Sequence, residues 1–210
     1  MSLIYSTKMK TIFTIISSFL IMTAGFSQTY KNVNEVEGIR VGIDAPLFSA
    51  LDSENKTFSL ADELKRGPVV IIFYRGHWCP VCNRHLAQIQ DSLNLITEKG
   101  ATIVAVSPEK PEYLDKTEEK TGAKFRLLYD KDYIISEAYD VNFLSRNKKL
   151  FIYNATLNAN LKEAHSDDSQ RLPIPATFII NMEGKIVWRQ FNPNYKKRST
   201  VKDILINLPK

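Results

Sequence analysis

Apolar residues form two continuous runs in the chain, with a helix-like pattern between them. Residues 69–73 are all apolar and rich in β-branched side chains, which indicates a strand buried on both faces of a sheet. From residue 82 to residue 96, apolar residues recur at steps of three and four, as on a half-buried helix. Residues 102–106 form the second run. Strand, helix and strand without a hairpin predict a parallel pair with a right-handed crossover.

The pattern predicts a hairpin and a final helix late in the chain. Residues 176–180 and 186–190 have strand character and surround the turn 181–184. Asp203 follows Thr200 by three residues, which is typical of a capped helix start.

Shorter elements are predicted elsewhere. Residues 39–64 indicate a small antiparallel element, residues 111–121 a charged surface helix, and residues 127–139 a short strand followed by a helix. Asp130 is expected to act as a turn or capping residue there.

Residues 142–172 lack clean periodicity. Aromatic side chains stand among many Asn and Lys residues, and a segment of this length predicts a functional lid or an insertion with structure of its own. His165 is expected on the surface, with a catalytic role as the alternative.

The N-terminal segment has the order of a secretory signal peptide. Lys8 and Lys10 precede an apolar stretch at 11–24, and small residues follow. We predict a signal peptide at 1–27 with cleavage after Ser27, although an uncleaved anchor is an alternative. A flexible lead-in at 28–38 and one domain at 39–210 would remain, in a periplasmic or extracellular protein.

The charge and the cysteine content of the chain limit the classes of function that the sequence supports. The whole chain has a formal charge of +5, and without residues 1–27 it has 26 basic and 23 acidic residues. This excess is small and dispersed, so it does not favour nucleic-acid binding. No other apolar stretch is long enough to span a membrane permanently. An exported chain with two cysteines and no disulfide framework indicates chemistry rather than structural crosslinking.

The two cysteines lie at the junction of the buried strand and the helix. Pro80 suits the first turn, which places Cys79 at the helix mouth and Cys82 one turn inside. Free N–H groups and the helix dipole should lower the pKa of Cys79. We predict a redox dithiol in which Cys79 attacks and Cys82 resolves.

The sequence gives less support to other roles for the cysteine pair. A disulfide across so small a ring stabilises little, because the entropic gain grows with loop length. A metal bound by Cys79, Cys82 and His85 would lack a second cysteine pair, and haem attachment would need His where Asn83 stands. The sequence therefore predicts no cofactor and no metal.

Four segments together resemble a known family. They are VGIDAP at 41–46, FYRGHWCPVC at 73–82, LPIPATFIIN at 172–181 and FNPNY at 191–195. They resemble the thioredoxin fold and, more narrowly, the AhpC/TSA peroxiredoxin-like (redoxin) family over residues 41–208. The resemblance implies an α/β fold: a central mixed sheet flanked by helices, with the insertion before the late hairpin.

The resemblance also implies site roles. Pro175 matches a proline that is cis in this fold and lies against the dithiol, and Trp78 and Pro175 should form a platform there. Arg75 and His77 either tune the thiols or are solvated loop residues.

The chain departs from both subfamilies. In the peroxiredoxin register, Arg75 replaces a proline, Cys79 replaces a threonine, Cys82 takes the peroxidatic position, and Pro175 replaces an arginine. A peroxidase would then form a sulfenic acid on Cys82 with which Cys79 condenses. The buried acid of thioredoxins is replaced by Phe73.

Three functions remain open from the sequence. The resemblance implies an antioxidant, thiol-dependent peroxidase, whereas WCPVC with Pro175 favours a protein thiol–disulfide reductase. The third is a non-enzymatic binding module in which the 142–172 insertion holds a partner. The expected partners of the enzymes are a peroxide or a disulfide-bearing protein, and an external thiol as electron donor.

Overall fold

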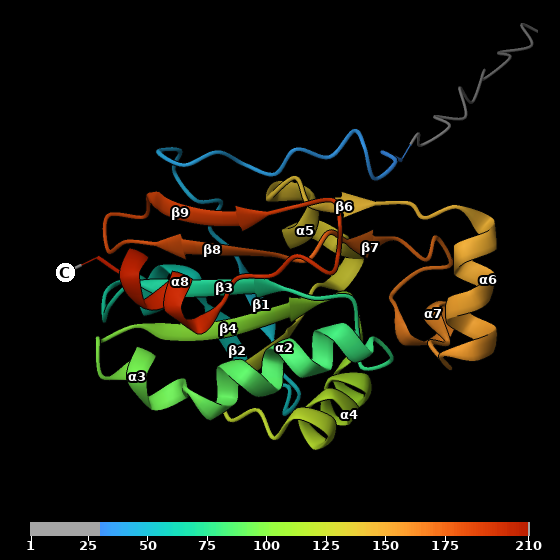
Figure 1. The fold of residues 1–210 in the computed structure, drawn as a ribbon, viewed down its shortest axis with the longest axis horizontal. Helices are drawn as coiled ribbons and strands as arrows, with labels where there is room; N and C mark the ends of the chain where they lie inside the picture. Colours follow the sequence, from blue (N-terminus) through green and yellow to red (C-terminus); the bar gives the residue numbers. More distant parts are fainter. Residues whose placement is uncertain (1–29, 210) are drawn as a thin grey trace, which may run out of the picture.

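A computed structural model describes residues 30–209, and the predicted signal peptide lies outside this range. A five-stranded mixed sheet runs through the centre of the molecule, in the order β5-β4-β3-β8-β9 (Figure 1). Its strands are β3 (Val69–Phe73), β4 (Thr102–Ser107), β5 (Arg126–Tyr129), β8 (Ala176–Ile180) and β9 (Ile186–Phe191). The first three are parallel, and β8 and β9 are antiparallel to their neighbours.

Strand β3 is the middle strand, as its continuous apolar run predicts. All five residues are buried, because side chains on both faces meet a hydrophobic layer. Val70 and Ile72 join one core cluster, and Val69, Ile71 and Phe73 join the other. The predicted parallel pairing with β4 is confirmed.

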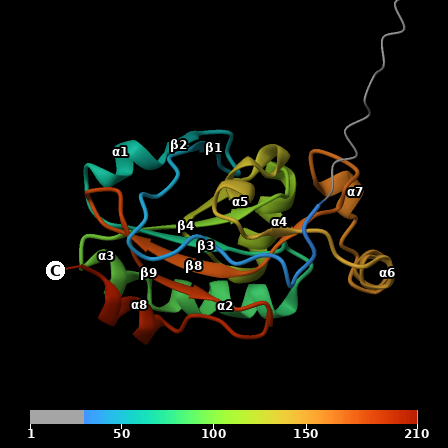
Figure 2. The same cartoon turned by 90° about the horizontal axis from the view of Figure 1, so that it is seen from above.

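Helices cover both faces of the sheet. Figure 2 shows α2, α3 and α8 on one face and α1, α5 and the β1–β2 hairpin on the other. The bounds are β1 (Ser49–Leu51), β2 (Thr57–Ser59), α1 (Leu60–Leu64), α2 (Pro80–Asp91), α3 (Leu93–Thr97), α4 (Pro111–Thr121), a 3-10 turn at Lys131–Tyr133, α5 (Ile134–Ala138) and α8 (Val201–Asn207). Helix α4 buries one side, including Tyr113 and Leu114, so it is not solvated all round.

The helix predicted after the cysteines is divided. Ser92 leaves helical geometry at φ −117° and ψ 14°, so that α2 ends and α3 begins there. The apolar spacing continues across the break. Leu86, Ile89 and Ile96 are consequently all buried in the same cluster.

The insertion is an ordered unit. It holds β6 (Asn142–Phe143), α6 (Asn147–Thr156), α7 (Leu161–Ala164) and β7 (Leu172–Pro173). Antiparallel pairing of β6 with β7 closes its base, and α6 and α7 lie beyond one end of the sheet (Figure 1).

His165 is buried, so its prediction as a surface residue is wrong. Only 1% of it is exposed, and its Nδ1 lies 3.0 Å from the hydroxyl of Tyr133. The polar residues around it indicated a surface, but the chain after α7 turns this ring inward. Burial lowers the pKa of His165 to about 3, so the ring is neutral at physiological pH.

The segment before the domain is attached to it along residues 30–38. Backbone hydrogen bonds join Gly38 to Asp140 and Leu144 to Lys31, and Val36 is buried. No helix within residues 30–209 is long and apolar enough to cross a membrane.

Candidate active site

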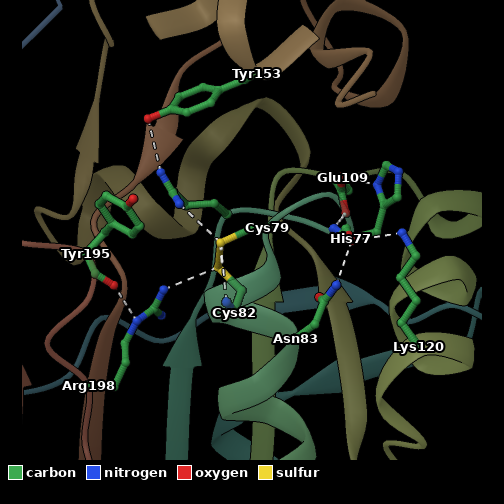
Figure 3. Close-up of a disulfide and its surroundings, with 10 residues drawn as sticks. His77, Cys79, Cys82, Asn83, Glu109, Lys120, Tyr153, Tyr195 and Arg198 are labelled. Carbon is green, nitrogen blue, oxygen red and sulfur yellow. Dashed lines mark hydrogen bonds and ion pairs between the residues drawn. A yellow bond between two sulfur atoms is a disulfide. The ribbon is translucent and has the colours of Figure 1, made fainter. Parts of the chain in front are cut away.

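The two cysteines lie at the carboxyl end of β3, where the chain turns into α2. Cys79 is the N-cap residue of α2 and Pro80 takes the first turn, as predicted. Cys79 and Cys82 form a disulfide with their Cα atoms 5.2 Å apart, and both residues are fully buried. Figure 3 shows this pair with side chains from distant segments on both sides.

Arg75 contacts the first sulfur. Its Nη2 lies 3.1 Å from Cys79 Sγ, and its Nη1 donates to the hydroxyl of Tyr153 at 3.2 Å. The guanidinium also stacks on Tyr195, with 4.0 Å from Cζ to the ring centroid. Since only 4% of Arg75 is exposed, it is not a solvated loop residue.

Arg198 contacts the second sulfur. Its Nη2 lies 3.3 Å from Cys82 Sγ, and its Nε donates to the carbonyl of Tyr195 at 2.7 Å. In the sequence, Arg198 counts only as one of a small cluster of basic residues with Lys196 and Lys197, and its contact with Cys82 was not predicted. The one signal that pointed to this region was the FNPNY segment directly before it, which ends at Tyr195.

Arg75 is buried and Arg198 is half-buried, and neither has an acidic partner among the described residues. Within residues 30–209, neither Arg75 nor Arg198 forms an ion pair with a carboxylate. Burial lowers the pKa of Arg75, and burial with the charge of Arg75 lowers the pKa of Arg198 to about 9. Both groups still carry their charge at pH 7. Two positive charges at the sulfur pair would favour a thiolate at either cysteine after reduction.

His77 faces away from the sulfurs and fixes the active-site loop. Its Nδ1 lies 2.7 Å from Oε1 of Glu109, and its backbone N–H donates to Oε2 at 2.8 Å. Its carbonyl accepts from Asn83 and Lys120, on the side of the disulfide opposite Arg198 (Figure 3). Burial raises the pKa of Glu109, which is fully enclosed. His77 is therefore a buried loop residue that touches neither sulfur.

A glycine is required directly before His77. Gly76 has φ +145°, which L side chains rarely adopt, and a Cβ there would overlap the carboxylate of Glu109. The loop thus passes close to Glu109 on the connection that follows β4.

Trp78 lies in the core with the dithiol, and Pro175 lines a cavity. Trp78 is 3% exposed, shares a core cluster with both cysteines, and stacks on Tyr153 with centroids 4.7 Å apart. Pro175 lines a cavity beside Arg75. The expected cis bond is wrong, because the peptide bonds within residues 30–209 are all trans. The backbone of Ile174 donates to Val141 at 2.7 Å, which holds the chain extended from β7 into β8.

The cavity beside Arg75 has a volume of about 550 Å³. Residues of the insertion, of the segment before the domain and of the β9–α8 connection surround it. Its walls include Arg75, Arg146, Lys149, Tyr153, Pro175 and Tyr195. Within residues 30–209, no group of three His, Cys, Asp or Glu residues is placed to hold a metal.

Comparison with known proteins agrees with this geometry. The profile of the AhpC/TSA family matches residues 41–189. Peroxiredoxin Bcp of Bacillus subtilis is 32% identical over 154 residues, covering 72% of this chain and 86% of that protein. Thiol-disulfide oxidoreductase ResA of Geobacillus thermodenitrificans is 24% identical over 174 residues, covering 82% of each.

Solved structures show the same fold. The crystal structure of peroxidoxin BcpB from Mycobacterium tuberculosis matches with a TM-score of 0.61 at 18% identity, over 80% of this chain and 96% of that one. A peroxiredoxin-like protein from Aquifex aeolicus also gives 0.61, at 19% identity, over 81% and 86%. The predicted thioredoxin-like α/β fold with a mixed central sheet is confirmed.

Proposed function

The chain belongs to the AhpC/TSA family, and from that premise we propose that this oxidoreductase is a thiol-dependent peroxidase that cycles Cys79 and Cys82 between dithiol and disulfide. One observation carries the proposal: both sulfurs are fully buried, and each contacts a guanidinium group. Burial excludes close contact with a folded protein and favours a small oxidant. The two positive charges stabilise the thiolates that the chemistry needs.

Cys82 is the residue that we propose to react with peroxide. It holds the peroxidatic position of the family register, and Arg198 supplies the cation that Pro175 cannot. The Cys82 thiolate attacks one peroxide oxygen. An S–O bond forms, the O–O bond breaks, and the leaving oxygen takes up a proton as water or an alcohol.

Cys79 then resolves the sulfenic acid. Its thiolate attacks the Cys82 sulfur, the S–S bond forms, the S–O bond breaks, and the hydroxyl leaves as water after taking up a proton. The result is the Cys79–Cys82 disulfide that the structure contains. Two external thiols would restore the dithiol and leave as a disulfide.

Stopped-flow tryptophan fluorescence tests this proposal. The reduced protein, with Trp188 replaced by Phe so that Trp78 gives the signal, is mixed with hydrogen peroxide. We expect a second-order rate constant well above that of a free thiol. Cys82→Ser should abolish the reaction, whereas Cys79→Ser should stop at a sulfenic acid on Cys82 that dimedone labels. A wild-type rate no faster than a free thiol would contradict peroxidase activity.

Protein thiol–disulfide exchange is the second candidate. It is favoured by Cys79 at the N-cap of α2, where the helix end supports a nucleophilic thiolate. Fast exchange with a protein disulfide and slow reaction with peroxide would identify this activity. Full function in a Cys79→Ser, Cys82→Ser protein would instead indicate a binding module.

We further propose that the enzyme acts outside the cytoplasm after removal of residues 1–27. The charged, apolar and small-residue order of that segment supports this. The exported protein should begin at Gln28 when its N-terminus is sequenced. Recovery of an intact N-terminus from the cytoplasmic fraction would contradict export.

A further inference from the structure

We infer that the cavity beside Arg75 binds the carboxylate of a low-molecular-weight thiol, and that this thiol reduces the Cys79–Cys82 disulfide. The inference rests on the proposed function, because it assigns the electron donor of the same catalytic cycle. Its basis is the charge, the size and the position of the cavity.

The charged residues that line the cavity are all cations. Arg75, Arg146 and Lys149 contribute to its walls, and none of its lining residues is Asp or Glu. Arg75 is 4% exposed, its Nε has no hydrogen-bond partner, and it has no carboxylate partner within residues 30–209. A buried cation without an anion is costly, so an anionic ligand would gain from binding here.

The size and the walls of the cavity fit a small organic molecule. About 550 Å³ lies within the usual range of small-molecule sites, which is roughly 300–1,000 Å³. Tyr153, Tyr195 and Pro175 supply apolar surface, while Arg146 and Lys149 are exposed at the wall formed by the insertion. The complete burial of both cysteines also favours a small donor over a protein.

Arg75 links the cavity to the disulfide. It forms part of the cavity wall, and its Nη2 lies 3.1 Å from Cys79 Sγ. Cys79 does not itself line the cavity, so a thiol bound against Arg75 would lie one side chain away from this sulfur. Cys79 is the sulfur that must be attacked if Cys82 is to leave. Arg198, 3.3 Å from Cys82 Sγ, would stabilise the leaving thiolate.

Each reduction consumes two donor thiols. The first donor thiolate attacks Cys79, a donor–Cys79 disulfide forms, and the electron pair of the broken bond goes to Cys82. The second donor thiolate attacks the donor sulfur, so that the donor disulfide leaves and Cys79 is released as a thiolate. The donors are oxidised, and the protein takes up the protons that its two thiols require.

The charge of the donor provides the test. The oxidised protein is mixed with 3-mercaptopropionate, 2-mercaptoethanol or cysteamine, and Trp78 fluorescence reports reduction. Each rate is divided by the rate of the same thiol with a neutral disulfide, which removes differences in intrinsic reactivity. We expect the anionic thiol to be fastest and the cationic thiol slowest. Glutarate, an unreactive dicarboxylate, should inhibit reduction by mercaptopropionate competitively.

A double variant of the cavity wall and a matched control locate the effect. Arg146→Gln with Lys149→Gln should lower the preference for the anionic thiol about threefold to tenfold and weaken glutarate inhibition. Lys148→Gln removes an exposed charge from the same helix outside the cavity and should leave both unchanged. Equal corrected rates for the three thiols would overturn the inference. So would an equal loss of preference in the control, which would indicate general surface charge.

The experiments distinguish a failure of this inference from a failure of the proposed peroxidase function. A rapid peroxide reaction without charge preference would overturn this inference alone. A clear anion preference without a rapid peroxide reaction would overturn the peroxidase proposal and leave the cavity as a thiol site.

Discussion

Arg75 is the residue whose charge acts most directly on Cys79. A positive charge at this distance favours the thiolate and so lowers the pH at which a thiol ionises. In the Cys82→Ser background, Arg75→Met should therefore move the pH midpoint of Cys79 alkylation by iodoacetamide upward. Mass spectrometry of the alkylated protein gives the rate at each pH.

Arg84→Met is the matched control for this measurement. Arg84 is an exposed arginine on α2, the helix that carries both cysteines, and removing it should leave the midpoint unchanged. An unchanged midpoint in Arg75→Met would show that the helix end alone, and not the guanidinium, ionises Cys79.

Residues close to the cysteines in sequence were identifiable before the structure, and distant ones were not. Cys79, Cys82, Trp78 and Arg75 lie in one short motif, so local spacing points to them. Arg198 is separated from Cys82 by 116 positions, and only the return of the chain after β9 brings it to the sulfur. Arg198, which the sequence alone places among surface charges, is therefore one of the two cations that contact the sulfurs.

At the scale of elements, α2 and the segment before α8 are joined at His85. The Nε2 of His85 donates to the carbonyl of Ser199 at 3.0 Å, directly beside Arg198. Burial, followed by the charge of Arg198, lowers the pKa of His85 to about 4, so the ring is neutral in the folded protein. This bond holds the Arg198 backbone against the helix that carries Cys82.

Protonation of His85 should destabilise the fold at acid pH. In the unfolded chain the ring titrates near 6.5, so from about pH 6.5 down to about 4 only the unfolded state takes up the proton. The free energy of unfolding then falls by about 1.4 kcal/mol per pH unit, up to about 3 kcal/mol. His165 should contribute in the same direction. Urea unfolding at pH 7.5 and pH 4.5 measures the loss.

His85→Leu should remove the part of this pH dependence that comes from His85, which is at most about 3 kcal/mol. It should also lower stability at pH 7.5 by about 1–3 kcal/mol, because the Ser199 carbonyl loses its donor. The change in unfolding free energy between the two pH values separates these effects. An identical change in His85→Leu and wild type would show that His85 takes up its proton equally in the folded and the unfolded protein.

Elements with strong local patterns were predictable, and those that depend on tertiary contacts were not. Strands β3, β4, β8 and β9 match their predicted positions closely. Each has a continuous or alternating apolar pattern within its own few residues, so no distant contact is needed to identify it. Helix α6 buries only Leu150, so its sequence has no apolar stripe from which a helix could be predicted. The trans bond before Pro175 was not predicted either; it lies in the connection from β7, which pairs with β6, to β8.

At the scale of the whole molecule, the active site lies where three separate parts of the chain meet the end of β3. The loop before α2 supplies Arg75 and Cys79, and the first turn of α2 supplies Cys82. The insertion supplies Tyr153, and the β9–α8 connection supplies Tyr195 and Arg198. The charges of buried Arg75 and half-buried Arg198 therefore gain an anionic partner only when the dithiol is reduced and ionised. The stability of the fold should report this dependence.

The reduced protein should be more stable than the oxidised protein above pH 8.5. The disulfide joins residues only three apart, so it restricts the unfolded chain little. Reduction provides a thiolate that pairs with the guanidinium groups and so raises the free energy of unfolding. This stabilisation is complete above the pKa of an unfolded cysteine, about 8.5. It is lost as pH falls through the lower pKa of the folded protein. Thermal unfolding at pH 9 should give a higher Tm for the reduced form, by about 2–4 °C per kcal/mol.

The difference between the two forms should become smaller as pH falls from 9 to 5, because the thiolate that pairs with the guanidinium groups takes up a proton. At pH 9 it should shrink in Arg75→Met, because the reduced form loses its ion pair while the oxidised form loses an unpaired buried charge. Arg84→Met should retain the wild-type difference. A more stable reduced form also makes the disulfide a stronger oxidant, so the reduction potential should fall in Arg75→Met. A higher Tm for the oxidised wild type at pH 9 would show that the two guanidinium groups do not favour the reduced state, and the electrostatic basis of the cycle would be wrong.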